Sequence, residues 1–258
     1  MSREGSDPLD LSGQTALITG GTRGIGRAIA LKLAAQGARV VLNYLRNKRA
    51  AEDTAAAIEA LTGRRPLLLK ANVGDPDKVA ELMALLKNET DKLDILVSNA
   101  ASGVLRPAIE LSKRHLEWTF EINTYAMLFL AQQALPLMPA GARILAISSQ
   151  GATHAIPNYA AVGASKAALE ALVRHLCLEL APRGIHVNAI SAGVVDTEAL
   201  SHFPNREELI ARSAAETPAG RLVSPEDVAG VALFLCSPLA DMIHGQTLVV
   251  DGGYRIRS

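Results

Sequence analysis

The sequence predicts an α/β fold, a single doubly wound Rossmann-type domain with a parallel sheet flanked by helices. Three observations predict it. Short apolar runs alternate with helical patterns along the whole chain, a glycine-rich turn joins the first run to the first helix, and no repeat or linker divides the 258 residues. Strands that are apolar throughout and joined by helices indicate a parallel sheet covered on both faces. We therefore expect one domain spanning residues 1–258.

The expected strands are short runs of aliphatic residues. In chain order they are 15–19, 39–43, 66–71, 93–99, 142–148, 186–192 and 247–251. The expected helices between them repeat apolar residues with helical periodicity. In chain order they are 24–36, 49–61, 77–87, two long segments around 112–138, then 158–181 and 225–235.

Stop and start residues support these helix boundaries. Gly37 and Gly63 follow the first two helices, Asp75 or Asp77 can cap the third, and Pro182 ends the long one near 181. The stretch 194–220 is less regular.

Composition excludes several classes of function. Lys plus Arg and Asp plus Glu both total 26, and this zero net charge gives no support to binding of nucleic acid or of an anionic membrane. No apolar run reaches the ~18–20 residues of a membrane span, and the polar first residues lack a signal core. We expect a cytoplasmic protein. Cys177 and Cys236 fit apolar helical patterns, and the six histidines lack metal-ligand spacing, so no metal is expected.

The glycine-rich turn Thr19–Gly26 follows the first strand and opens a helix. This context predicts a nucleotide site, because the helix start presents free N–H groups and a positive dipole end to a pyrophosphate. The spacing is Gly-x-x-x-Gly-x-Gly, which differs from the commonest dinucleotide motif. Glycines that only form a turn are the simpler alternative.

The end of the second strand predicts which dinucleotide binds. NAD sites usually carry an acidic residue there for the ribose 2′-hydroxyl. Here the chain has Asn43-Tyr-Leu-Arg46 and no carboxylate from position 39 until Glu52. Cations near this point favour a 2′-phosphate, so we expect NADPH, with Arg23 and Arg46 as its contacts. Solvated surface charge is the alternative.

Tyr159 and Lys166 are candidate catalytic residues on the long helix near 158–181. Seven residues at about 100° each return to nearly the same helix face, which places the two about 10 Å apart if the helix is continuous. Pro157 and Asn158 indicate that the helix starts close to the tyrosine. A tyrosine packed on the core and a solvated lysine are the alternatives.

The motifs together resemble the short-chain dehydrogenase/reductase family over nearly the whole chain. They are Thr19–Gly26, Asn72-Val73, Asn99-Ala-Ala101, Asn123, Ser148-Ser149, Lys166 and Asp251-Gly-Gly253. The resemblance implies that Asn72 and Val73 lie near the adenine, that Asn99–Ala101 line the path of ribose and nicotinamide, and that Asn123 supports a proton-relay water. The expected cofactor contacts are Gly20, Thr22, Arg23, Gly24, Ile25, Gly26, Asn43, Arg46, Asn72, Val73, Asn99, Ala100, Ala101, Lys166, Gly193, Val195 and Thr197.

The chain departs from the usual family pattern at the tyrosine. Val162 stands thirteen residues after Ser149, where the family tyrosine normally lies four residues before the lysine. Tyr159 and Lys166, with six residues between them, instead resemble the enoyl-acyl-carrier-protein reductases of the superfamily. The segments 99–107, 202–207 and 217–221 are similar to the NADPH-dependent type III enzyme of Gram-positive bacteria. Ser149 departs from many enoyl reductases, which hold a tyrosine there.

Enoyl-thioester reduction would explain why the tyrosine is displaced. Hydride lands on the β-carbon, while negative charge develops on the thioester oxygen two carbons away. Tyr159 would stabilise that enolate, and Lys166 would hold the nicotinamide ribose or favour the negative charge. Ser149 would position the carbonyl or cap the strand, and Asn123 would support the relay or serve as a buried structural residue. Tyr125 is a weaker alternative acid.

The predicted function is NADPH-dependent reduction of the 2,3 double bond of an enoyl thioester of acyl-carrier protein or coenzyme A, as in fatty acid biosynthesis. Residues 194–220 would form a lid over the acyl chain, or an ordinary pair of surface helices. Arg106, Arg206 and Arg212 are candidates for a basic rim. The family resemblance also implies a homotetramer. A carbonyl or 3-oxoacyl reductase and an NADPH-binding sensor without turnover are the alternatives.

Overall fold

The computed structural model describes residues 7–196 and 206–256. Its centre is a seven-stranded sheet in the order β3-β2-β1-β4-β5-β6-β7, with every pair of neighbours parallel. The strands are β1 (Thr15–Ile18), β2 (Arg39–Tyr44), β3 (Leu67–Lys70), β4 (Ile95–Ser98), β5 (Arg143–Ser149), β6 (His186–Ala192) and β7 (Thr247–Val250). The predicted fold class, a doubly wound parallel sheet, is confirmed.

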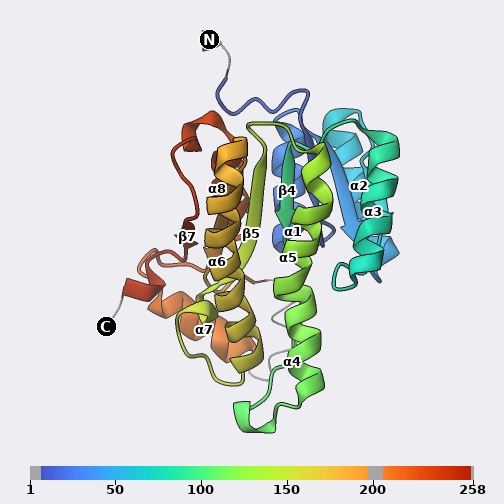
Figure 1. The fold of residues 1–258 in the computed structure, drawn as a ribbon. Helices are drawn as coiled ribbons and strands as arrows, with labels where there is room; N and C mark the ends of the chain where they lie inside the picture. The colour runs from blue at the N-terminus through green and yellow to red at the C-terminus, as the bar shows by residue number, and fades with distance from the viewer. Residues whose placement is uncertain (1–6, 197–205, 257–258) are drawn as a thin grey trace.

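Helices cover both faces of the sheet (Figure 1). The helices are α1 (Gly24–Ala35), α2 (Lys48–Thr62), α3 (Pro76–Glu89), α4 (Lys113–Phe120), α5 (Ala126–Ala134), α6 (Ala160–Leu180), α7 (Arg206–Glu216) and α8 (Pro225–Cys236). Helix α1 packs against α2 and α8 on one face, whereas α3 packs against α5 and α4 against α6 on the other. Within the described part of the chain, no helix is both long and apolar enough to cross a membrane.

Two hydrophobic clusters hold the layers together, one on each face of the sheet. Side chains alternate between them along β1, because successive strand residues point to opposite faces. Leu17 belongs to the cluster with α3, α5 and α6, while Ala16 and Ile18 belong to the cluster with α1 and α8. All three are fully buried. Burial on both faces explains why the strands are apolar throughout.

The predicted helix starts and stops agree with the structure at most boundaries. Gly63 adopts a left-handed conformation with φ 71° at the end of α2, and the Asp75 carboxylate caps α3 by accepting from the N–H groups of Asp77 and Lys78. The structure differs within 112–138, where the π-helical segment η2 (Glu121–Tyr125) joins α4 and α5. In Figure 1 these form one green helical run. Wider helical turns of this kind are frequent at functional sites.

The long helix begins later than predicted. Asn158 has φ 62°, a left-handed conformation that interrupts a helix, so α6 starts at Ala160 with Tyr159 as its N-cap residue. The continuous-helix spacing expected for Tyr159 and Lys166 therefore does not apply. Helix α7 lies within the predicted lid, but residues 197–205 of that lid, including Thr197, fall outside the described residues.

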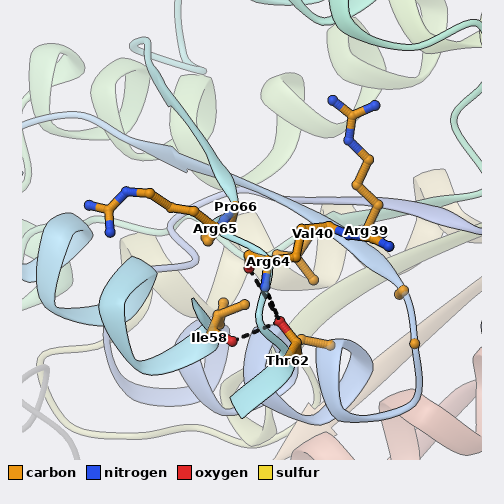
Figure 2. Close-up of a pocket in the computed structure, with 10 residues that line it drawn as sticks. Arg39, Val40, Ile58, Thr62, Arg64, Arg65 and Pro66 are labelled. Carbon is orange, nitrogen blue, oxygen red and sulfur yellow. Dashed lines mark hydrogen bonds between the residues drawn. The ribbon is translucent and has the colours of Figure 1, made fainter. Parts of the chain in front are cut away.

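The topology places the functional loops at one edge of the sheet. Strand order reverses between β1 and β4, and ligands of such sheets bind at the carboxyl ends of the strands beside this point. The pocket in Figure 2 lies at the opposite edge, between the starts of β2 and β3, and is lined by residues that include Arg39, Thr62 and Arg64. Its volume of about 90 Å³ is too small for a dinucleotide, given that ligand pockets measure roughly 300 Å³ or more.

Candidate active site

The turn between β1 and α1 is shaped for close approach of another molecule to its backbone. A Cβ atom added at Gly26 would overlap the Asn99 amide nitrogen and the Gly20 carbonyl oxygen, so the turn accepts only glycine there. The turn leads directly into the first turn of α1, whose N–H groups favour a phosphate. These residues fit the pyrophosphate of a dinucleotide.

Asn99 and Thr19 fasten this turn to the loop after β4. The Asn99 amide donates to the carbonyl oxygens of Thr19 and Gly20, at 2.9 and 3.1 Å. The Thr19 hydroxyl accepts from the backbone N–H groups of Asn99 and Ala100, both at 3.0 Å. The structure thus brings the predicted residues Gly20, Asn99 and Ala100 together at one edge of the sheet. The side chain of Asn99 is engaged in shaping the turn.

The residues predicted to select the cofactor lie beside the same edge. Asn43 is buried, and its amide donates to the carbonyl oxygens of Leu69 and Ala71 at 3.2 and 3.1 Å, which ties the end of β2 to β3. Arg23 and Arg46 have exposed side chains, the first at the start of α1 and the second just after β2. This arrangement leaves the two arginines, rather than Asn43, facing solvent where a ribose phosphate would arrive.

Other predicted contacts follow the ends of β3 and β6. Val73 is buried, and the Asn72 side chain accepts from the N–H group of Gly74 at 3.2 Å. The Gly193 N–H group donates to Val250 O at 2.9 Å, and Val195 forms an isolated bridge with Val223. These bonds fix the backbone that borders the crevice.

Tyr159 and Ser149 meet at the carboxyl end of β5. The Tyr159 hydroxyl donates to Ser149 Oγ at 3.3 Å. The tyrosine ring lies against the short 3-10 segment after β5, where a Cβ at Gly151 would come within 2.5 Å of a ring carbon. A Cβ at Gly163 on α6 would in turn come within 2.6 Å of Gly151 O. Gly151 therefore makes room for the ring, and Gly163 makes room for the Gly151 carbonyl.

Electrostatics keep the Tyr159 phenol protonated. Burial raises its pKa above the usual value, and the hydrogen bond with Ser149 lowers it by a smaller amount. A neutral phenol at neutral pH is a hydrogen-bond donor, which is the form that stabilises a developing oxyanion.

Lys166 is buried on α6, with 5% of its surface exposed, and its ammonium group donates to Ile147 O at 2.7 Å. Burial lowers its pKa to about 8, and the negative charge of Glu170 acts in the opposite direction. Lys166 and Tyr159 thus both donate hydrogen bonds to the last three residues of β5. The proposal that this lysine is merely solvated is wrong, because its side chain is enclosed.

Asn123 lies in the π-helical segment and bridges two parts of the site. Its side-chain oxygen accepts from the Ser102 N–H group, and its amide donates to Ser165 Oγ, both at 2.9 Å. Ser165 directly precedes Lys166. Asn123 therefore joins the loop after β4 to α6 beside Lys166, while Tyr159 and Lys166 bond to the end of β5 that carries Ser149.

Val162 has no room for a larger side chain. It is 8% exposed, and a Cβ added at Gly103 would overlap its methyl group. The loop after β4 therefore lies directly on the position where the usual family tyrosine would stand. Tyr125, the weaker alternative acid, is 46% exposed and forms a tilted ring contact with Phe120.

Sequence reasoning missed several residues that shape the site. Gly103, Gly151 and Glu170 were not among the predicted site residues, although Gly103 lies within the segment 99–107 and the one-turn spacing of Glu170 from Lys166 was a usable signal. Of the basic-rim candidates, Arg106 is exposed and Arg212 pairs with Glu216 at 3.4 Å. The Arg206 side chain lies outside the described residues.

Comparison with known proteins assigns the family. The profile of a family described as Enoyl-(Acyl carrier protein) reductase matches residues 20–255. The chain belongs to the short-chain dehydrogenase/reductase superfamily. Reductases of this superfamily bind a nicotinamide cofactor, in agreement with the glycine turn.

Relatives of the superfamily include reductases of different substrates. The 1-cyclohexenylcarbonyl-CoA reductase of Streptomyces collinus is 39% identical over 245 residues, which cover 94% of this chain and 87% of the relative. A solved short-chain alcohol dehydrogenase from Sinorhizobium meliloti is 34% identical with a TM-score of 0.90, covering 98% of this chain and 100% of that one. The reductase LugOII, described as catalysing keto-reduction at C1 in lugdunomycin biosynthesis, is 35% identical with a TM-score of 0.87, covering 96% and 99%. The chain is accordingly an oxidoreductase of reductase type.

Proposed function

We propose that the protein is an NADPH-dependent reductase of the 2,3 double bond of an enoyl thioester. The observation that carries the proposal is the displaced phenol. Tyr159 lies before α6 and bonds Ser149, while Val162 and the loop at Gly103 fill the position from which a family tyrosine would serve the oxygen of a carbonyl whose carbon receives hydride. A donor moved away from that position suits an oxygen two carbons from the carbon that receives hydride.

The chain's own groups then have separate tasks. The neutral Tyr159 phenol donates a hydrogen bond to the thioester oxygen as negative charge develops there, and Ser149 Oγ orients the phenol. The charged Lys166 ammonium would favour that negative charge from its buried position at the end of β5, and it would also hold the cofactor ribose. Bound NADPH would supply the hydride to the β-carbon, and a proton drawn from solvent would then complete the reduction at the α-carbon. Asn123 keeps the loop after β4 attached to α6, which preserves the wall of the site.

One relative supports this substrate class. A 1-cyclohexenylcarbonyl-CoA carries its double bond next to a thioester carbonyl, so the name of the Streptomyces collinus reductase describes an enoyl thioester. The carrier of the present substrate, acyl-carrier protein or coenzyme A, and assembly as a homotetramer are parts of the proposal. Arg23 and Arg46, with no acid at the end of β2, support NADPH.

Carbonyl reduction is the second candidate, because LugOII is described as a keto-reductase and shares the fold at 35% identity. One assay separates the two. Purified protein is mixed with NADPH and either crotonoyl or acetoacetyl thioester, each on coenzyme A and on a carrier-protein mimic, and the loss of NADPH absorbance is followed.

We expect NADPH loss with the crotonoyl thioester and not with the acetoacetyl thioester, and slower loss when NADH replaces NADPH. A reversed thioester preference would reject enoyl reduction in favour of carbonyl reduction. Tight NADPH binding with turnover of neither substrate would favour a sensor.

A further inference from the structure

Glu170 is a buried carboxylate beside the candidate active site. It lies on α6 one helical turn after Lys166, on the same side of the helix, and only 9% of its surface is exposed. Its Oε1 atom accepts a hydrogen bond from Ser148 Oγ at 2.5 Å. Buried acidic side chains are rarely found without a hydrogen-bond or ion-pair partner, because removing a charge from water is costly.

The partners of Glu170 and Lys166 are neighbours in the chain. Lys166 donates to the carbonyl oxygen of Ile147, and Glu170 accepts from the side chain of the next residue, Ser148. Both residues of β5 belong to the strand end that also carries Ser149. The same short stretch of β5 therefore holds the cation and the anion in fixed places relative to the Tyr159 phenol.

We propose that Glu170 is a positioning residue, whose carboxylate, anchored by Ser148, keeps the buried ammonium group of Lys166 charged and held at the end of β5. A lone ammonium in this enclosed place would give up its proton more readily, because burial disfavours the charged form. Glu170 supplies the opposite charge that offsets this cost, and it acts through Lys166 without touching substrate.

Among the described residues, Glu170 is the charged group that raises the pKa of Lys166 against the effect of burial. The elements that pack against α6 carry other titratable groups, which lie at far strand ends or on outward-facing turns. These groups are Arg143 at the start of β5, His186 at the start of β6, Arg183 just after α6, Lys113, Arg114, His115 and Glu117 on α4, and Glu121 and Tyr125 on η2.

The test is a titration of Lys166 by NMR in protein labelled with ¹³C at the lysine ε-carbon, with the signal assigned by its loss in Lys166→Met. Glu170→Gln keeps the size of the side chain and an acceptor for Ser148 but removes the charge. We expect the titration midpoint of Lys166 to fall by about one pH unit or more, which makes its charged fraction about tenfold smaller at alkaline pH. Glu179→Gln, an exposed acid on the same helix, should leave it unchanged.

A second variant keeps the proposal testable should Glu170→Gln fail to fold. Ser148→Ala retains the charge but removes its anchor, and it should shift the midpoint in the same direction by less. An unshifted Lys166 titration in either folded variant would overturn the proposal, as would an equal shift in Glu179→Gln.

The consequence for turnover rests on the proposed function and is measured separately. Loss of the Lys166 proton should lower kcat/KM at alkaline pH. In Glu170→Gln, the pH at which kcat/KM falls should therefore move downward by the same amount as the NMR midpoint of Lys166. Wild-type protein that reduces no enoyl thioester would defeat the proposed function but leave the NMR result standing. An active enzyme with an unmoved alkaline limb would count against Glu170 alone.

Discussion

The phenol of Tyr159 has a defined position without being part of a regular helix. Asn158, just before Tyr159, has a left-handed backbone conformation, and Gly151 leaves space for the tyrosine ring. A sequence pattern predicted the identity of this residue but not its geometry, because the left-handed conformation of an asparagine depends on the surrounding loop. Ser149 and Lys166 were predicted from motif spacing, and the structure brings both to the same strand end.

Removing the Tyr159 hydroxyl tests its role directly. Tyr159→Phe keeps the ring against Gly151 but removes the hydrogen-bond donor, so we expect kcat for crotonoyl thioester to fall by about 100-fold or more. NADPH affinity, measured by fluorescence titration, should stay near the wild-type value. Full activity in this variant would exclude Tyr159 from the mechanism. Tyr125→Phe, at an exposed position, is the matched control and should retain activity.

Restoring the usual family spacing should fail for a steric reason. Val162→Tyr would push a ring into the loop at Gly103, where even a Cβ on that glycine would overlap the valine. Overpacking of this kind costs about 1–3 kcal/mol, which a urea titration would detect. The double variant Tyr159→Phe, Val162→Tyr should therefore stay inactive. Recovered crotonoyl reduction in the double variant would show that the site tolerates either tyrosine position.

At the scale of elements, the apolar strands and most helix ends were predictable from local chemistry. Gly63 ends α2 and Asp75 caps α3 through contacts within a few residues, so these boundaries can be predicted from the sequence. The apolar periodicity of α1 and α8 is likewise local. The π-helical segment was not predictable, because it depends on contacts of Asn123 and Thr124 with Ser165 from a distant helix. The lid expected at 194–220 stays a prediction, since residues 197–205 lie outside the described residues.

The β1–α1 turn provides a prediction with a matched control. Gly26→Ala would overlap Asn99 and the Gly20 carbonyl, so the turn must open and NADPH binding should weaken strongly. Gly230→Ala, in the middle of α8, has no heavy atom within 4 Å of the added Cβ and should raise stability by up to ~1 kcal/mol. Isothermal titration and thermal melts report the two effects. Unchanged NADPH affinity in Gly26→Ala would mean that the turn does not hold the cofactor.

For the whole molecule, the sequence predicted the class of sheet because apolar strands and intervening helices leave few arrangements. The order β3-β2-β1-β4-β5-β6-β7 adds that the strand order reverses between β1 and β4, beside the glycine turn. Glu170 was missed because an acid on a long helix is usually solvated, and its one-turn spacing from Lys166 does not by itself show burial. The structure shows that Glu170 is buried because α6 packs on β5, where Ser148 donates to the Glu170 carboxylate.

The buried Lys166 should make the free energy of unfolding of the whole protein depend on pH. The pKa of Lys166 is about 8 in the folded protein and 10.5 for an ordinary lysine. Below pH 8 both folded and unfolded chains hold the proton, and the cost of burying the ammonium is fully present. Between about pH 8 and 10.5 the unfolded chain binds more protons, so the free energy of unfolding should rise with pH.

Comparison with Lys166→Met isolates this effect from tyrosines and other lysines that titrate in the same range. The wild-type free energy of unfolding, minus that of the variant, should increase by about 3 kcal/mol from pH 8 to 10.5, because each pKa unit corresponds to about 1.4 kcal/mol. Urea titrations at several pH values measure it. A flat difference would mean that Lys166 keeps an ordinary pKa in the folded protein, so that enclosure of its ammonium group carries no net cost.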